Sequence, residues 1–156
     1  MRVIIQLCAA FLGAMGFALL FNTKKEKILP ASFGGVLEWG IYLLCARYMD
    51  GIFVPCLIAS AFCALYAEVL ARGLKAPATV FFVPSIVPMI PGSGLYYAMS
   101  YAVQKDWGMA RKQGFLTAQY ALGIALGISL VWALIHMLRV ISAEIRQRKG
   151  SLGNRA

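Results

Sequence analysis

The chain has 156 residues, of which 61% are hydrophobic and only 13% are charged, and its mean hydropathy is +0.75. Soluble domains carry about 25% charged residues, so this composition argues against a soluble enzyme and against a secreted disulfide scaffold. The net charge of +9 comes from short Lys and Arg clusters between apolar blocks, which favours contact with the lipid bilayer and argues against nucleic-acid binding.

Five apolar blocks are long enough to span a membrane, since a spanning helix needs about 20 mostly apolar residues. They cover residues 3–21, 28–46, 51–71, 76–103 and 115–138. We therefore expect an all-α integral membrane protein with about five transmembrane helices in a single transmembrane domain, residues 1–156. Pro30 and Pro55 fit the first turn of the second and third helices. After the last block we expect a basic cytoplasmic tail, residues 139–156, that is either a short helix or disordered.

The fourth block differs from the others because its centre is rich in proline and glycine. Pro84, Pro88 and Pro91 each remove a helical hydrogen bond, and Gly92 and Gly94 weaken the helix further. A continuous helix therefore cannot run through residues 84–94. The alternative, an ordinary proline kink, needs fewer such residues.

The distribution of basic residues predicts the orientation of the chain. With five crossings, ten Lys and Arg residues lie on one side of the membrane and five on the other. If the fourth block entered and left on the same side, the split would be eight against seven. The positive-inside rule favours five crossings in the cell (inner) membrane, with the N-terminus outside and the C-terminus in the cytoplasm.

The break in the fourth block is the first candidate site. Backbone groups without helical partners at membrane depth must face protein or a wet cavity. A half-helix starting around Ser93 would point free N–H groups into that cavity, which suits a carboxylate or a phosphate. The tyrosines that follow could add hydroxyl groups. The predicted substrate-binding residues are Pro84, Ser85, Pro88, Pro91, Gly92, Ser93, Gly94 and Tyr97.

Two glutamates lie inside apolar blocks and are candidates for proton coupling. A charged group at the centre of a spanning helix costs ~2.5 to 3.5 kcal/mol, so it is a functional candidate by default. Glu38 lies near the centre of its block, whereas Glu68 lies close to the end of its block. For Glu68 the alternative is an ion pair with Arg72, one helical turn away.

Motifs for catalysis, metal binding or a cofactor are not found in the sequence, so we expect no enzyme activity, metal or cofactor. The four cysteines lie in apolar blocks and are expected to be packing residues, and His136 is expected at the membrane interface. Small residues recur at four-residue spacing, as in Gly123 and Gly127, which lets helices approach closely. The spacing does not decide between packing within the chain, on a second copy or on another subunit.

The run from Glu68 to Tyr96 resembles the threonine/serine exporter family. The likeness is carried by Ala-Pro-Ala-Thr-Val-Phe at residues 76–81, Pro-x-Ile-x-Pro at 84–88 and Pro-Gly-x-x-x-Tyr at 91–96, with a further match at 16–22. It extends over most of the chain. The likeness is specifically to the small component that corresponds to the carboxyl half of the exporter.

This resemblance implies a five-helix half-transporter that works with a second, larger membrane chain equivalent to the exporter's amino-terminal half. It also implies export of threonine and serine driven by the proton-motive force, or, as in related two-chain members, of a dicarboxylate such as succinate. Glu38 departs from the family pattern, in which a small residue is expected before Trp39, so it is either a specialised feature of this chain or a residue that pairs with the partner chain. The alternative to transport is a structural or assembly subunit of a membrane complex.

Overall fold

The computed structural model describes the backbone of residues 1–153 and the side chains of residues 1–141. All regular structure among them is helical, which confirms the all-α prediction. The helices are α1 (Arg2–Leu20), α2 (Lys25–Tyr48), α3 (Phe53–Gly73), α4 (Thr79–Ile86), α5 (Gly92–Val103) and α6 (Trp107–Gly153), with a short 3₁₀ turn, η1 (Val87–Met89), between α4 and α5.

Four of these helices are long and apolar enough to cross a membrane by themselves. They are α1, α2, α3 and the apolar part of α6, Trp107–Ile141. The pair formed by Thr79–Met89 and Gly92–Val103 makes a fifth candidate span that is bent by 48° at the break. The count of four to five spans agrees with the prediction of about five, with the fourth one broken.

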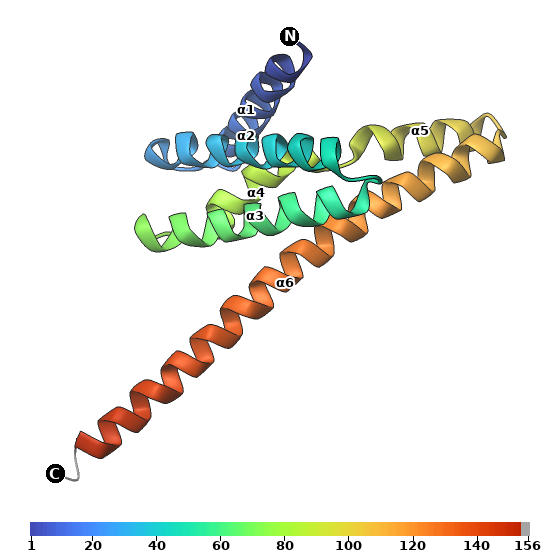
Figure 1. The fold of residues 1–156 in the computed structure, drawn as a ribbon. Helices are drawn as coiled ribbons and strands as arrows, with labels where there is room; N and C mark the ends of the chain where they lie inside the picture. The colour runs from blue at the N-terminus through green and yellow to red at the C-terminus, as the bar shows by residue number, and fades with distance from the viewer. Residues whose placement is uncertain (154–156) are drawn as a thin grey trace.

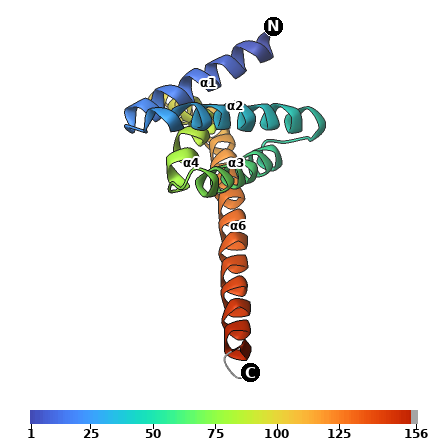
Figure 2. The same ribbon diagram turned by 90° about the vertical axis from the view of Figure 1, so that its left-hand side faces the viewer.

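The helices form a bundle from which the N-terminal end of α1, one hairpin and one long helix extend (Figure 1). α2 and α3 run antiparallel side by side, and α4 packs against both of them. α5 and the first part of α6 form a hairpin that continues past the connection between α2 and α3. α6 then returns across α3 and runs on beyond the bundle, as Figure 2 also shows.

Small residues hold α3 and α6 together. A Cβ atom added at Gly123 would lie 2.7 Å from the carbonyl oxygen of Phe53, and one added at Gly127 would collide with the carbonyl oxygen of Leu57. The hydroxyl of Ser60 lies in the same contact, 3.1 Å from the Leu57 oxygen. This small-residue pair is therefore used for packing within the chain, because only a residue without a side chain lets the two backbones come this close.

The fourth span is broken over a shorter stretch than the sequence predicts. α4 continues through Pro84 to Ile86, and α5 begins at Gly92, so the helix is interrupted between these residues and not over all of 84–94. Ile90 is extended, with ψ of 123°, because the ring of Pro91 disfavours a helical conformation in the residue before it. The helix axis changes direction at this point.

Two further helix bounds differ from those expected. α2 begins at Lys25, so Pro30 lies inside the helix and not in its first turn, and its carbonyl oxygen accepts a hydrogen bond of 2.8 Å from Tyr66. α6 is continuous from Trp107 to Gly153, so the expected tail from residue 139 onward is no separate element as far as the structure describes it. Residues 154–156 lie outside the described part.

Candidate functional site

One face of α2 packs against the broken segment. Ala31, Gly34, Gly35 and Glu38 are three or four residues apart, so they lie on the same side of the helix, and all of them are buried. The hydroxyl of Ser85 in α4 lies 2.8 Å from the carbonyl oxygen of Ala31 and donates a hydrogen bond toward it. This face of α2, formed by Ala31, Gly34, Gly35 and Glu38, is therefore the surface on which the broken segment packs, and we call it the wall.

The two glycines of this wall allow a very close approach. A Cβ atom at Gly34 would lie 2.9 Å from the Cβ of Ser85, and one at Gly35 would lie 3.3 Å from the Cγ of Pro88. Distances below about 3.4 Å leave no room for a side chain. Of the predicted site residues, Pro84 and Ser85 are consequently buried in this contact, and Pro88 is half-buried beside it.

Glu38 is the charged residue of the wall. Its side chain is 0% exposed, and neither carboxyl oxygen has a hydrogen-bond partner among the described residues. The thiol of Cys63 in α3 lies against this carboxyl group and is the polar group nearest to a hydrogen bond with it. Cys56, which is also on α3 and near enough to Glu38 to interact with it electrostatically, packs with Met89 of η1. The carboxyl group is thus enclosed between α2 and α3, next to the break.

A small cavity reaches the break from the side of α1. Its volume is about 230 Å³, and it is lined by Pro88, by Trp39 of α2 and by residues of α1, among them Gln6. The indole N–H of Trp39 is buried and has no acceptor among the described residues. The walls of this cavity are otherwise mostly apolar, and Gln6 is the polar side chain among its lining residues.

The second half of the predicted break site lies outside the bundle. Gly92 and Ser93 are exposed, Pro91 is half-buried, and Tyr97 is 49% exposed. A Cβ atom at Gly94 would lie 2.5 Å from the hydroxyl oxygen of Thr117, so this glycine permits the contact between α5 and α6. The predicted residues therefore divide into a buried group before the interruption and a more open group after it.

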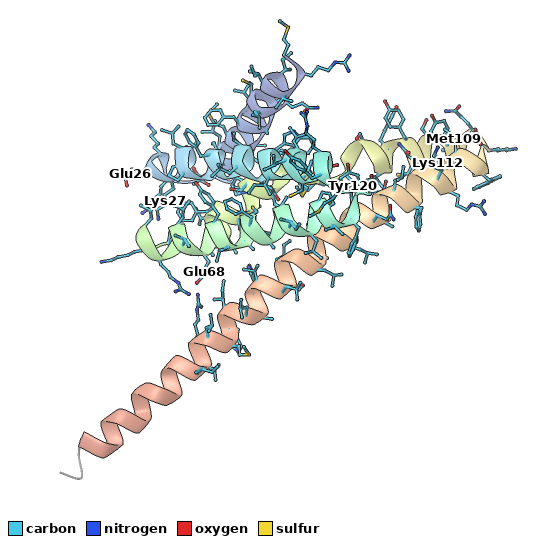
Figure 3. The ribbon with its side chains drawn as sticks, viewed as in Figure 1. Glu26, Lys27, Glu68, Met109, Lys112 and Tyr120 are labelled. Carbon is cyan, nitrogen blue, oxygen red and sulfur yellow. The ribbon has the colours of Figure 1, made fainter. Side chains whose placement is uncertain are left out.

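Glu68 lies away from the break. Its carboxylate forms an ion pair of 3.2 Å with Arg72, as the alternative prediction had it, and a second one with Arg139 of α6. Figure 3 shows Glu68 between α3 and α6, far along α6 from Tyr120. Thr117, the contact of Gly94, is 22 residues from Arg139, which is about 33 Å along a helix. A single small substrate cannot join Glu68 to the start of α5.

A second and larger cavity surrounds Glu68. Its volume is about 460 Å³, and its walls come from the end of α3, the connection to α4, and α6. His136 and Trp132 line it together with Arg72 and Arg139. His136, expected only at the interface, thus shares a cavity with three charged side chains.

Sequence reasoning missed several of these residues. The glycines of α2 could have been found, because Ala31, Gly34 and Glu38 follow helical spacing. Cys63 and Arg139 carry no such signal, since their partners lie on other helices and 25 and 71 residues away along the chain. The hydrogen bond of 2.5 Å between Tyr42 and Tyr120, which joins α2 to α6, was not predictable for the same reason.

Comparison with known protein families identifies the chain. Residues 6–134 match the family described as "Threonine/Serine exporter, ThrE". This range covers well over half of the chain and includes the break, Glu38 and Glu68. The chain belongs to the threonine/serine exporter family. No solved structure matches it.

Membership in the threonine/serine exporter family, together with the apolar helices, makes this chain a multi-pass membrane protein of exporter type. The family is one of transporters and not an enzyme class. His136 and Arg139 lie beyond the matched residues, so part of the larger cavity is built by a segment outside the family match.

Proposed function

We propose that this exporter-family chain is one subunit of a proton-coupled exporter for small metabolites that carry a carboxylate, with threonine and serine as the first candidates. The observation that carries the proposal is the enclosed carboxyl group of Glu38 beside the break. The family supplies the transport class, and the site supplies a group that can hold a proton.

The enclosed position of Glu38 favours the protonated form of its carboxyl group. An ionised carboxylate without a partner costs several kcal/mol in such an interior, whereas a neutral carboxyl group costs much less. A carboxyl group that is enclosed in one conformation and reached by water in another therefore takes up and releases a proton as the conformation changes. Such a cycle ties substrate movement to the proton-motive force.

The predicted substrate site at the break remains part of this proposal. The N–H of Gly92 donates to the carbonyl oxygen of Ile90, but α5 has no side-chain cap, so the N–H groups of Ser93 and Gly94 and the helix dipole are available to a carboxylate. The cavity at Trp39 reaches the interrupted segment at Pro88. The start of α5 supports a carboxylate-binding function for residues 84–94, together with Tyr97.

A second, larger membrane chain is the proposed partner. α5 buries none of its residues, although it is apolar, and its hairpin with α6 extends beyond the bundle (Figure 1). On α1, Gly13 and Gly16 face open space. Apolar helices with small-residue faces are suited to pack against other helices, either of the larger chain or of a second copy.

The proposed orientation keeps the N-terminus outside and the C-terminus in the cytoplasm of a cell (inner) membrane. A bend of 48° between the two halves of the fourth span is far from a reversal of direction, which supports a full crossing. With an odd number of crossings the two termini lie on opposite sides of the membrane.

The first test is efflux of threonine, serine and succinate from preloaded cells. Cells express this chain alone, a larger membrane chain that resembles the exporter's amino-terminal half alone, or both chains. We expect flux of threonine and serine only with both chains, and loss of this flux when a protonophore collapses the gradient. Flux of succinate alone would overturn the amino-acid assignment. Normal assembly of both chains with no flux would overturn transport in favour of a structural subunit.

A second test abolishes proton uptake and release at position 38. Glu38→Gln keeps the size of the side chain but cannot ionise, so gradient-driven efflux should fall by about tenfold or more while substrate exchange at equal concentrations persists. Glu26→Gln, at the exposed start of α2, is the matched control. Unchanged driven efflux in a correctly inserted Glu38→Gln protein would rule out this residue as the coupling group.

A further inference from the structure

The larger cavity combines charges of both signs with an apolar wall. The side chain of Glu68 is only 12% exposed, and it is held between two arginines that are more than 60% exposed. Trp132 and Ile135 form the apolar part of the wall. The volume of about 460 Å³ corresponds to roughly 15 water molecules, which leaves room for a small metabolite.

The cavity has two positive side chains but only one negative side chain. One oxygen of Glu68, Oε1, accepts from both Arg72 and Arg139, so one negative group serves two positive ones. The cavity therefore has an excess of positive charge. A ligand that brings one carboxylate and one ammonium group would supply a second negative group for the two arginines and a positive group for Glu68, with the net charge of the cavity unchanged.

We propose that this cavity is a binding site for a zwitterionic α-amino acid. The ligand's carboxylate lies between the guanidinium groups of Arg72 and Arg139, and its ammonium group donates to Glu68. The inference rests on the proposed export function, and it names the substrate class and the site at which substrate is first bound. In the proposed orientation the cavity lies at the cytoplasmic end of α3.

The position of Glu68 discriminates between the two candidate substrate classes. A dicarboxylate could meet both arginines, but it would displace Glu68 from them and leave three carboxylates in one cavity. A zwitterion brings an ammonium group that can pair with Glu68, and it leaves the net charge of the cavity unchanged. His136 on the same wall offers a hydrogen-bonding group for the hydroxyl of serine or threonine.

The cavity and the break would then be successive positions for the same substrate. Glu68 and the start of α5 are too far apart to hold one molecule together, as their contacts on α6 show. The cavity would bind the amino acid from the cytoplasm, and the break would hold it during the crossing.

The experiment measures binding to the full-length chain in nanodiscs of uncharged phosphatidylcholine, which excludes competition by anionic headgroups. Tritiated L-serine is the probe, and binding is read by scintillation proximity. L-serinamide lacks the carboxylate and 3-hydroxypropionate lacks the ammonium group. We expect each to compete about tenfold or more weakly than L-serine, because each loses a charge-assisted contact. Succinate should compete weakly as well. Competition by succinate as strong as that by L-serine would overturn the zwitterion assignment.

Variants locate the bound serine. Arg139→Gln and Glu68→Gln should each weaken binding by about tenfold or more, whereas Arg111→Gln, an exposed arginine near the start of the same helix, should leave it unchanged. The double variant Glu68→Arg, Arg139→Glu keeps an ion pair but exchanges its ends. It should restore the thermal stability that either single change removes and still bind serine weakly.

Two outcomes would overturn the proposal. If the exchanged pair restores binding along with stability, the pair is structural. If Arg139→Gln and Glu68→Gln bind serine normally while Pro91→Ala does not, the bound serine lies at the break. Binding requires neither a partner chain nor a gradient, so its failure is separate from failure of the coupled flux that tests Glu38.

Discussion

At the scale of single residues, Gly34 shows how closely α2 and the broken segment are packed. A methyl group at this position would meet the Ser85 side chain and the Tyr66 ring, at 2.9 Å from the nearest ring carbon. Gly34→Ala should therefore lower the free energy of unfolding by about 1 to 3 kcal/mol. Unfolding by SDS in mixed micelles measures this change.

Gly16 of α1 provides the matched control for this prediction. Nothing lies within 4 Å of a Cβ atom placed there. Gly16→Ala should leave the free energy of unfolding unchanged or raise it by up to about 1 kcal/mol, because alanine favours the helix. Equal effects of the two substitutions would contradict the close packing at Gly34.

Residue-scale prediction from the sequence succeeds where the partner is local. The ion pair of Glu68 with Arg72 is one helical turn long, and it was predictable as the alternative to a functional role. The pair with Arg139 joins helices 71 residues apart along the chain, and only the crossing of α3 and α6 creates it. The burial of Glu38 follows from its depth in an apolar block, but the thiol against it does not.

At the scale of elements, the interruption between α4 and α5 depends most directly on Pro91. Alanine at this position would restore a backbone N–H and allow Ile90 to become helical. Pro91→Ala should therefore straighten the span and reduce efflux by about tenfold or more, while membrane insertion is retained. Efflux from cells that express both chains measures this effect.

Pro30→Ala is the matched control, because α2 is already continuous through Pro30. This change should leave efflux within twofold of the unsubstituted chain, a range of about 0.4 kcal/mol. A straight and fully active Pro91→Ala protein would show that the interruption is dispensable.

The number and type of elements could be predicted because long apolar blocks have few alternatives in a membrane. The residues at which the break begins and ends could not be predicted. Pro84 is accommodated inside α4, where it is fully buried next to the contact of Ser85 with α2, and the interruption is confined to the stretch before α5. Tertiary packing, which a count of prolines does not include, decides which proline interrupts the helix.

At the scale of the whole molecule, the arrangement predicts on which side each connection lies. With five crossings, reporters placed after Asp50 and Lys105 lie outside, and reporters after Lys75 and at the C-terminus lie in the cytoplasm. Alkaline phosphatase is active only outside, and green fluorescent protein fluoresces only inside. A fluorescent reporter after Lys105 with an active phosphatase at the C-terminus would instead establish a re-entrant fourth segment.

The long helix α6 has a mechanical consequence for the whole molecule. With 47 residues it is a rod of about 70 Å, and its backbone lies against the backbone of α3 at Gly123 and Gly127. A rod held there turns as a lever. A tilt of about 10° would move Arg139 by about 4 Å and Thr117 by about 2 Å in the opposite direction. A single tilt of α6 would then open the cavity at Glu68 and displace the start of α5 at the same time.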